Sequence, residues 1–181
     1  MTLSKIQAES MNLADTYAFS GTVSGAGKIL QVVSATKTDT FSSSSTDFTN
    51  ITGLTASITP ASTSNKIYIS VTTSGSVNGG GNLFFAIARG STQIALGDTA
   101  SNRTVCTSHW WVYDGVYYQH LSTPVTASHL DSPSTTSAVT YNMQLKAQSG
   151  VTGYVNRTAS DTDSVTKPRN SSTITLMEIA G

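Results

Sequence analysis

The stretch Val139-Thr-Tyr-Asn-Met-Gln-Leu-Lys-Ala147 alternates apolar and polar residues without a break. Side chains of a β-strand point to opposite faces in turn, so this pattern predicts a strand with one buried face. Residues 54–58 and 67–71 repeat the alternation, and a closing strand is expected over 173–179. Short runs separated by Gly, Pro, Asn, Asp and Ser are typical of antiparallel sheets, so the sequence predicts an all-β fold, an antiparallel β-sandwich.

The run 83–88 is apolar on both sides of the pleat. One side, formed by Leu83, Phe85 and Ile87, suits the core of the sandwich, and the other side needs a second cover. A long loop would provide this cover, but a neighbouring subunit is the preferred interpretation, which makes Phe84, Ala86 and Ala88 a candidate subunit-contact strand. A jelly roll of the tumour-necrosis-factor type, assembled as a homotrimer, is preferred over an immunoglobulin-like sandwich for this reason.

The chain divides into two parts. Residues 1–27 form an N-terminal arm with weak helical spacing followed by a Gly- and Ser-rich linker, and residues 28–181 form the sandwich domain. Residues 75–81 are rich in Gly and are expected to form a loop between two strands.

The polarity of the chain comes from hydroxyl groups, because Ser and Thr account for 57 residues whereas charged residues make up 11%. Ten basic residues balance ten acidic ones, which argues against a nucleic-acid partner. The sequence shows no membrane span and no signal peptide, and the single Cys106 excludes an internal disulfide, so folding in a reducing compartment such as the cytoplasm is expected. A hydroxyl-rich surface favours protein contacts with a low desolvation cost.

The sequence offers little catalytic chemistry. The three histidines, His109, His120 and His129, do not have the spacing of a metal site, and no Gly-x-Ser-x-Gly motif is present. The scattered aspartates next to Gly, Thr and Ser are typical of turns, although a glycosidase pair among them stays open as an alternative. We therefore expect no enzymatic activity, no metal and no cofactor.

One segment concentrates aromatic residues. It holds both tryptophans and three of the seven tyrosines, and we refer to it as the aromatic segment: His109, Trp110, Trp111, Tyr113, Tyr117, Tyr118 and His120. Such rings combine a rigid apolar area with a polar group, which suits either a packed subunit contact or a face that binds glycans. Both interpretations stay open at this point.

Several segments resemble a known domain. They are Lys28-Ile-Leu-Gln-Val-Val, Asn50-Ile-Thr-Gly-Leu54, Ser64-Asn-Lys-Ile67, Gly97-Asp-Thr, Ser101-Asn-Arg-Thr104, Leu130-Asp-Ser-Pro133 with Thr136-Ser-Ala, Thr152-Gly-Tyr-Val-Asn-Arg-Thr158 and Ser172-Thr-Ile-Thr-Leu-Met-Glu-Ile179. They resemble a β-sandwich domain of virion surface proteins of tailed phages, including those of cyanobacterial hosts. That domain occurs at the distal end of tail fibres and tailspikes, and similar trimeric sandwiches are capsid cement proteins.

The resemblance implies a virion structural protein without an active site. An arm of 27 residues reaches at most about 95 Å, which is short for a fibre shaft, so we expect a trimeric cement or decoration protein on the capsid exterior. Its partners would be further copies of itself and the major capsid protein, and the capsid-contact residues of the arm would be Leu3, Ile6, Met11 and Leu13. The alternative is the receptor-binding tip of a phage tail fibre, which recognises a host-surface glycan through the aromatic segment.

Overall fold

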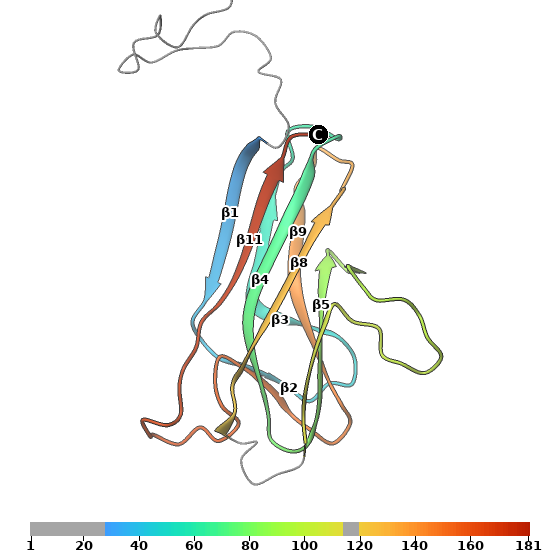
Figure 1. The fold of residues 1–181 in the computed structure, drawn as a ribbon. Helices are drawn as coiled ribbons and strands as arrows, with labels where there is room; N and C mark the ends of the chain where they lie inside the picture. Colours follow the sequence, from blue (N-terminus) through green and yellow to red (C-terminus); the bar gives the residue numbers. More distant parts are fainter. Residues whose placement is uncertain (1–27, 114–119) are drawn as a thin grey trace, which may run out of the picture.

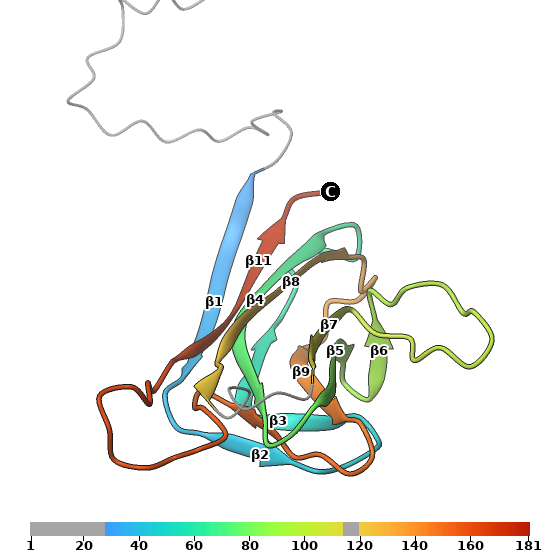
Figure 2. The same ribbon diagram turned by 60° about the horizontal axis from the view of Figure 1, so that its bottom comes forward.

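The computed structural model describes residues 28–113 and 120–181, which form two antiparallel β-sheets facing each other (Figures 1 and 2). Within the described residues the protein has no α-helix, and no helix there is long and apolar enough to cross a membrane. The expectation of an all-β fold made of antiparallel strands is confirmed, and the arrangement is sandwich-like.

The described residues form eleven strands, distributed over the two sheets. The first sheet contains β1 (Ile29–Lys37), β2 (Phe41–Ser43), β4 (Lys66–Val77), β8 (Thr123–Asp131), β10 (Gly153–Val155) and β11 (Ser172–Ile179). The second sheet contains β3 (Thr49–Ile58), β5 (Gly81–Arg89), β6 (Thr92–Ile94), β7 (Ser108–Val112) and β9 (Val139–Ala147).

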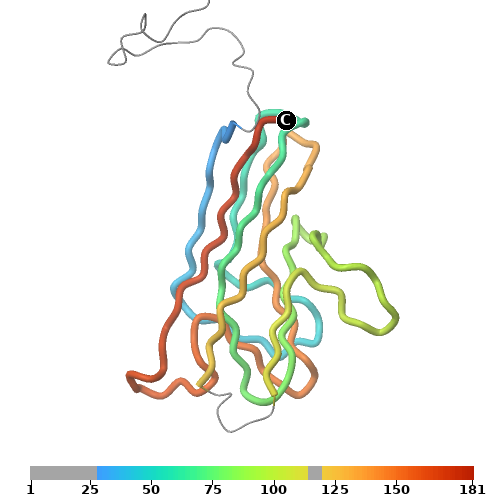
Figure 3. The backbone as a smooth tube through the Cα atoms, in the orientation of Figure 1, coloured from blue at the N-terminus to red at the C-terminus, as the bar shows by residue number. Residues whose placement is uncertain are grey.

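The strands pair in a nested order along the chain. β1 pairs with β11, β3 with β9, β4 with β8, and β5 with β7, each time antiparallel. The four main strands of the first sheet therefore lie in the order β1-β11-β4-β8, and those of the second sheet in the order β3-β9-β5-β7. The smoothed backbone in Figure 3 follows this course, with the first and last strands side by side.

The core lies between the two sheets. It is built from the inward-facing residues of strands in which apolar and polar residues alternate. These residues are almost inaccessible to solvent: Ile51, Leu54, Ile58, Ile67, Ile69, Val71, Leu83, Phe85, Ile87, Tyr141, Met143, Leu145, Ile174 and Leu176. This confirms the inward positions predicted from the alternation of residues 54–58, 67–71 and 139–147. Burial of these side chains is the main favourable term in folding.

The outer face of β9 differs from the simple alternating pattern. Asn142 and Gln144 point away from the core and are nevertheless buried, with exposed fractions of 5% and 8%. The Gln144 side chain accepts a hydrogen bond from Gln93 Nε2 at 3.0 Å and donates one to Asn50 Oδ1 at 2.9 Å. Neighbouring amide side chains therefore cover the polar face of this strand, which binary patterning does not reveal.

The loop in the Gly-rich region 75–81 is shorter than the sequence predicts. β4 continues to Val77, and only residues 78–80 connect it to β5. Gly75 lies within β4, and close packing explains why this position is a glycine. A Cβ atom there would lie 3.3 Å from Cζ of Phe85. The expectation of a loop over the whole stretch was wrong because close packing, as well as a turn, can require glycine.

Candidate ligand groove on the second sheet

The aromatic segment is divided by the pleat of β7. Trp110 and Val112 point inward and pack against the core, whereas His109 and Trp111 are exposed. Trp111 is 55% exposed, and Tyr113, immediately after the strand, is 75% exposed. Because successive side chains of a strand face opposite ways, the two adjacent tryptophans have different roles, one in packing and one at the surface.

Trp111 and Tyr113 line a shallow groove where β5 begins and β7 ends. Its volume is about 280 Å³, and its lining is completed by Gly80, Gly81, Asn82, Val112 and Gln148. The two rings meet edge to face, with their centroids 6.0 Å apart and an interplanar angle of 69°. This geometry holds two large aromatic surfaces beside the polar side chains of the neighbouring strands.

Hydrogen bonds fix the polar side of the groove. The Asn82 backbone N–H donates to Gln148 Oε1 at 3.2 Å, and the Asn82 side-chain amide donates to the same oxygen. Asn82 Oδ1 lies 2.6 Å from His109 Nε2, and the His109 ring stacks on Phe84 with centroids 5.3 Å apart. The side chains of Asn82 and Gln148 are thus oriented before any ligand binds, which lowers the entropic cost of binding.

A glycine forms the floor between these groups. A Cβ atom on Gly81 would lie 3.0 Å from Cγ1 of Val151 and 3.6 Å from Oε1 of Gln148. The absence of a side chain therefore lets Val151 pack closely against β5, beside Gln148. An aromatic ring next to oriented amides suits a neutral, hydroxylated ligand, because the ring covers an apolar face and amides both donate to and accept from hydroxyl groups.

The other predicted site residues lie elsewhere. His120 is exposed, and its Nδ1 contacts Nζ of Lys167. Phe84 is half-buried beneath His109, whereas Ala86 and Ala88 are fully buried within a single chain, so their burial requires no second subunit. Their role in a subunit contact stays a prediction. Tyr117, Tyr118 and the arm residues Leu3, Ile6, Met11 and Leu13 lie outside the described residues.

Sequence reasoning missed the amides of the groove. Asn82 lies opposite Trp111 in the β5–β7 ladder, and Gln148 follows directly after β9. Neither residue belongs to a motif, and their proximity to Trp111 depends on the register of three strands that are distant in sequence. The only local signal was the Gly-Gly-Gly run before Asn82, which indicated a close approach of the backbone.

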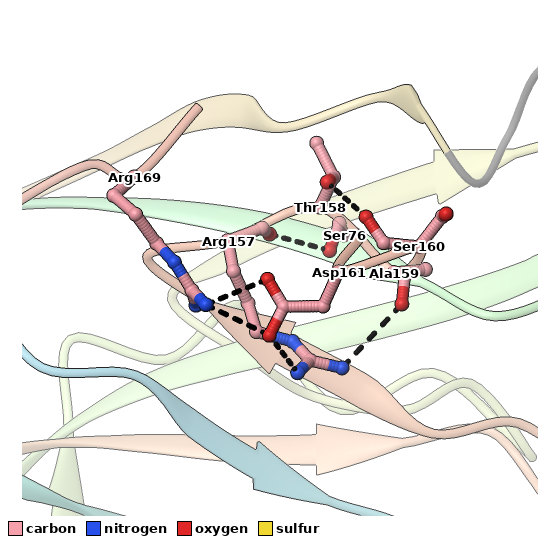
Figure 4. A network of polar contacts seen from close by, with 7 residues as sticks. All are labelled: Ser76, Arg157, Thr158, Ala159, Ser160, Asp161 and Arg169. Carbon is pink, nitrogen blue, oxygen red and sulfur yellow. Dashed lines mark hydrogen bonds and ion pairs between the residues drawn. The ribbon is translucent and has the colours of Figure 1, made fainter. Parts of the chain in front are cut away.

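A second polar cluster organises the long connection between β10 and β11 (Figure 4). Asp161 accepts hydrogen bonds from Arg157 Nη1 and Arg169 Nη2, each at 2.8 Å. The Arg157 guanidinium group also lies 4.2 Å from the centroid of the Tyr154 ring and donates to the backbone oxygen of Ala159. Both arginines bind the same carboxylate, so the cluster holds the loop in place.

Within residues 28–113 and 120–181, no three His, Cys, Asp or Glu side chains form a group that could hold a metal ion. A scan of the chain against models of protein families finds no match, and a search among curated proteins finds none either.

Proposed function

We propose that the two sheets form a jelly roll. The nested pairing of β1 with β11, β3 with β9, β4 with β8, and β5 with β7 supports this topology. A long antiparallel ribbon that is folded over on itself produces this nesting, and the jelly roll distributes such a ribbon over two four-stranded sheets. Jelly rolls are common in viral capsid proteins and lectins, both of which act through surface contacts.

On this basis we propose that the protein is a non-enzymatic structural protein of a virion surface. It acts as a homotrimeric cement or decoration protein that binds the major capsid protein and reinforces contacts between capsomers. The observation that carries this proposal is the nested strand order, together with the resemblance of eight sequence segments to phage surface domains. Each copy that binds the assembled shell adds binding free energy to the assembled state.

The number of copies per particle tests the location. Quantitative mass spectrometry of purified virions would give the ratio of this chain to the major capsid protein. A ratio close to one supports decoration of the shell. A ratio of a few copies per particle, in step with tail components, would contradict decoration and assign the chain to a fibre.

The oligomeric state tests the assembly separately. Size-exclusion chromatography with light scattering at micromolar concentrations should give three times the chain mass of 18.9 kDa. A mass equal to one chain at every concentration would refute the obligate trimer without bearing on the location of the protein.

The groove favours a second candidate function, the recognition of a host-surface glycan at a fibre tip. The exposed rings of Trp111 and Tyr113 beside the amides of Asn82 and Gln148 support a site for a neutral sugar. This recognition is compatible with either location on the virion.

A glycan array with the intact protein tests the second candidate. We expect binding of a neutral glycan that weakens at least tenfold in Trp111→Ala, because the ring supplies most of the apolar contact. Val165→Ala is the matched control, since it removes a fully exposed apolar side chain that does not line the groove. Absence of binding to every neutral glycan, or equal binding by both variants, would exclude the groove as a sugar site.

A further inference from the structure

The hydrogen bonds of the groove fix how the Gln148 amide is oriented. A backbone N–H can only donate, so the atom of Gln148 that receives the Asn82 N–H at 3.2 Å is the oxygen Oε1. The Asn82 side chain turns its Nδ2 toward the same oxygen, because two amide oxygens would have no hydrogen between them. The orientation of both amides therefore follows from a single backbone donor.

The tautomer of His109 is fixed in the same way. Asn82 Oδ1 lies 2.6 Å from His109 Nε2, and an amide oxygen can only accept, so Nε2 carries the proton. The His109 ring also stacks on Phe84, which holds it in place. His109, Asn82 and Gln148 thus form a chain of hydrogen bonds in which every bond runs in the same direction. The chain ends at the amino group of Gln148, Nε2.

The unused hydrogen-bonding capacity of these two amides consists mainly of donors. Asn82 engages both lone pairs of Gln148 Oε1, and His109 engages one lone pair of Asn82 Oδ1. Among the described residues, Gln148 Nε2 has no partner and Asn82 Nδ2 has one. Two N–H hydrogens of Gln148, one N–H hydrogen of Asn82 and one lone pair of Asn82 Oδ1 therefore remain for a ligand.

The rest of the groove adds apolar surface and no charge. Its other lining residues are Gly80, Gly81, Trp111, Val112 and Tyr113. The Trp111 side chain is 55% exposed, and its indole N–H is a further donor without acceptor capacity. The volume of about 280 Å³ lies slightly below that of pockets for drug-sized ligands, so the groove suits one small group of a larger molecule.

We infer that the groove binds the acetamido group of an N-acetylated amino sugar. This inference rests on the second candidate function, the recognition of a glycan, and names the chemical group that is recognised. An acetamido group has a carbonyl oxygen that only accepts, one N–H and a methyl group. The carbonyl accepts from Gln148 Nε2, the N–H donates to the remaining lone pair of Asn82 Oδ1, and the methyl group packs on the Trp111 ring.

A sugar that carries only hydroxyl groups matches this groove less well. Each hydroxyl that accepts from Gln148 Nε2 brings a hydrogen of its own, and the two amides have a single lone pair left to receive it. A hydroxyl also lacks the methyl group that covers the Trp111 ring. Because hydrogen bonds in a chain polarise one another, the bonds that start at His109 make Gln148 Nε2 a stronger donor to a carbonyl oxygen.

Pairs of glycans that differ only in the acetamido group test the inference on the full chain. Isothermal titration calorimetry compares triacetylchitotriose with cellotriose, and N-acetylgalactosamine with galactose, and a glycan array extends the comparison to further pairs. In each pair a hydroxyl group replaces the acetamido group. We expect the wild type to bind the N-acetylated member of at least one pair about tenfold more tightly, which is the effect of one well-placed hydrogen bond.

Substitutions at Gln148 test whether its amino group provides this preference. Gln148→Glu replaces Nε2 by an oxygen, and Gln148→Met removes Nε2 without adding a charge, so both should bind the two members of a pair equally. Trp111→Ala should weaken the binding of both members. Asn102→Asp is the control for the added charge, since Asn102 is exposed and does not line the groove, and it should retain the preference. Far-UV circular dichroism would establish that each variant is folded.

The outcomes separate this inference from glycan recognition itself. If the wild type binds glycans but binds both members of every pair equally, glycan recognition stands and the acetamido assignment fails. A preference that both Gln148 variants retain would overturn the assignment as well, because another group would then provide the donor. If the wild type binds no glycan at all, the second candidate function and this inference both fail.

Discussion

At the scale of single residues, Asn156 shows how one side chain joins distant strands. It has a positive φ of 62° and is completely buried. Its Nδ2 donates to the backbone oxygens of Lys37 and Asp39 at 3.0 Å, and its Oδ1 accepts from Ser172 Oγ at 2.6 Å. Asn tolerates the left-handed backbone region better than most residues, and here it also satisfies the carbonyl groups of Lys37, at the end of β1, and of Asp39, just after it.

We expect Asn156→Ala to reduce the free energy of unfolding by about 2 to 4 kcal/mol, because it removes the side-chain donor to the buried Lys37 carbonyl and to the Asp39 carbonyl, and leaves the Ser172 hydroxyl with Thr73 Oγ1 as its remaining partner. Urea denaturation measures this change. Ser134→Ala is the control, since Ser134 also has a positive φ, of 51°, but is exposed. A similar loss of unfolding free energy in both variants would show that backbone strain, and not the lost hydrogen bonds, causes the effect.

At the scale of elements, the short strand β10 depends on the absence of a side chain. Gly153 lies opposite Val77 of β4 and Ser43 of β2. A Cβ atom at Gly153 would lie 2.5 Å from Cδ2 of Leu83 and 3.3 Å from Cδ2 of Leu145. The three-residue strand therefore passes over the core of the second sheet at a distance that only glycine allows.

Gly153→Ala should destabilise the fold by about 1 to 3 kcal/mol, because the added methyl group overpacks the Leu83 and Leu145 contact. Thermal unfolding of the two proteins gives the difference. Gly97→Ala provides the comparison, since nothing lies within 4 Å of a Cβ atom at that position. It should be neutral or slightly stabilising, and an equal loss in both variants would argue against local overpacking.

At the scale of the whole molecule, the nested pairing brings both ends of the domain together beside one buried carboxylate. Glu178 of β11 is completely buried. It accepts hydrogen bonds from Asn65 Nδ2 at 2.5 Å, Gln31 Nε2 at 2.6 Å and the Ala61 N–H at 2.7 Å. Burial alone raises the pKa of Glu178, but these hydrogen bonds together outweigh burial and keep the pKa below its ordinary value of 4.5.

The sign of the pH dependence follows from this lowered pKa. The unfolded chain, with its ordinary Glu pKa of 4.5, binds more protons than the folded protein between the two values. The stability contributed by Glu178 is therefore complete above pH 4.5 and is lost as the pH falls through the folded-state pKa. We expect Glu178→Gln to lower the melting temperature at neutral pH and to make the acid-side decline shallower.

Differential scanning calorimetry at pH 7 and pH 3 measures both effects. Asp163→Asn is the control, because Asp163 is exposed and makes no hydrogen bond to another described residue, so it should follow the wild-type pH profile. A Glu178→Gln profile parallel to the wild type would show that another carboxyl group controls the acid response.

The sequence by itself determined β3, β4, β5, β9 and β11 and their inward faces, because the alternation of apolar and polar residues directly reflects the two-residue period of a pleated strand. It also located the aromatic segment, although not which of Trp110 and Trp111 is exposed, since either register of a strand fits the same pair. Only the tertiary structure decided that Asn82 and Gln148 lie beside Trp111, and that Val32, Met177, Tyr68 and Leu130 form one row across β1, β11, β4 and β8. These neighbours are separated by tens of residues along the chain, and their proximity depends on the pairing and register of several strands, which no local pattern specifies.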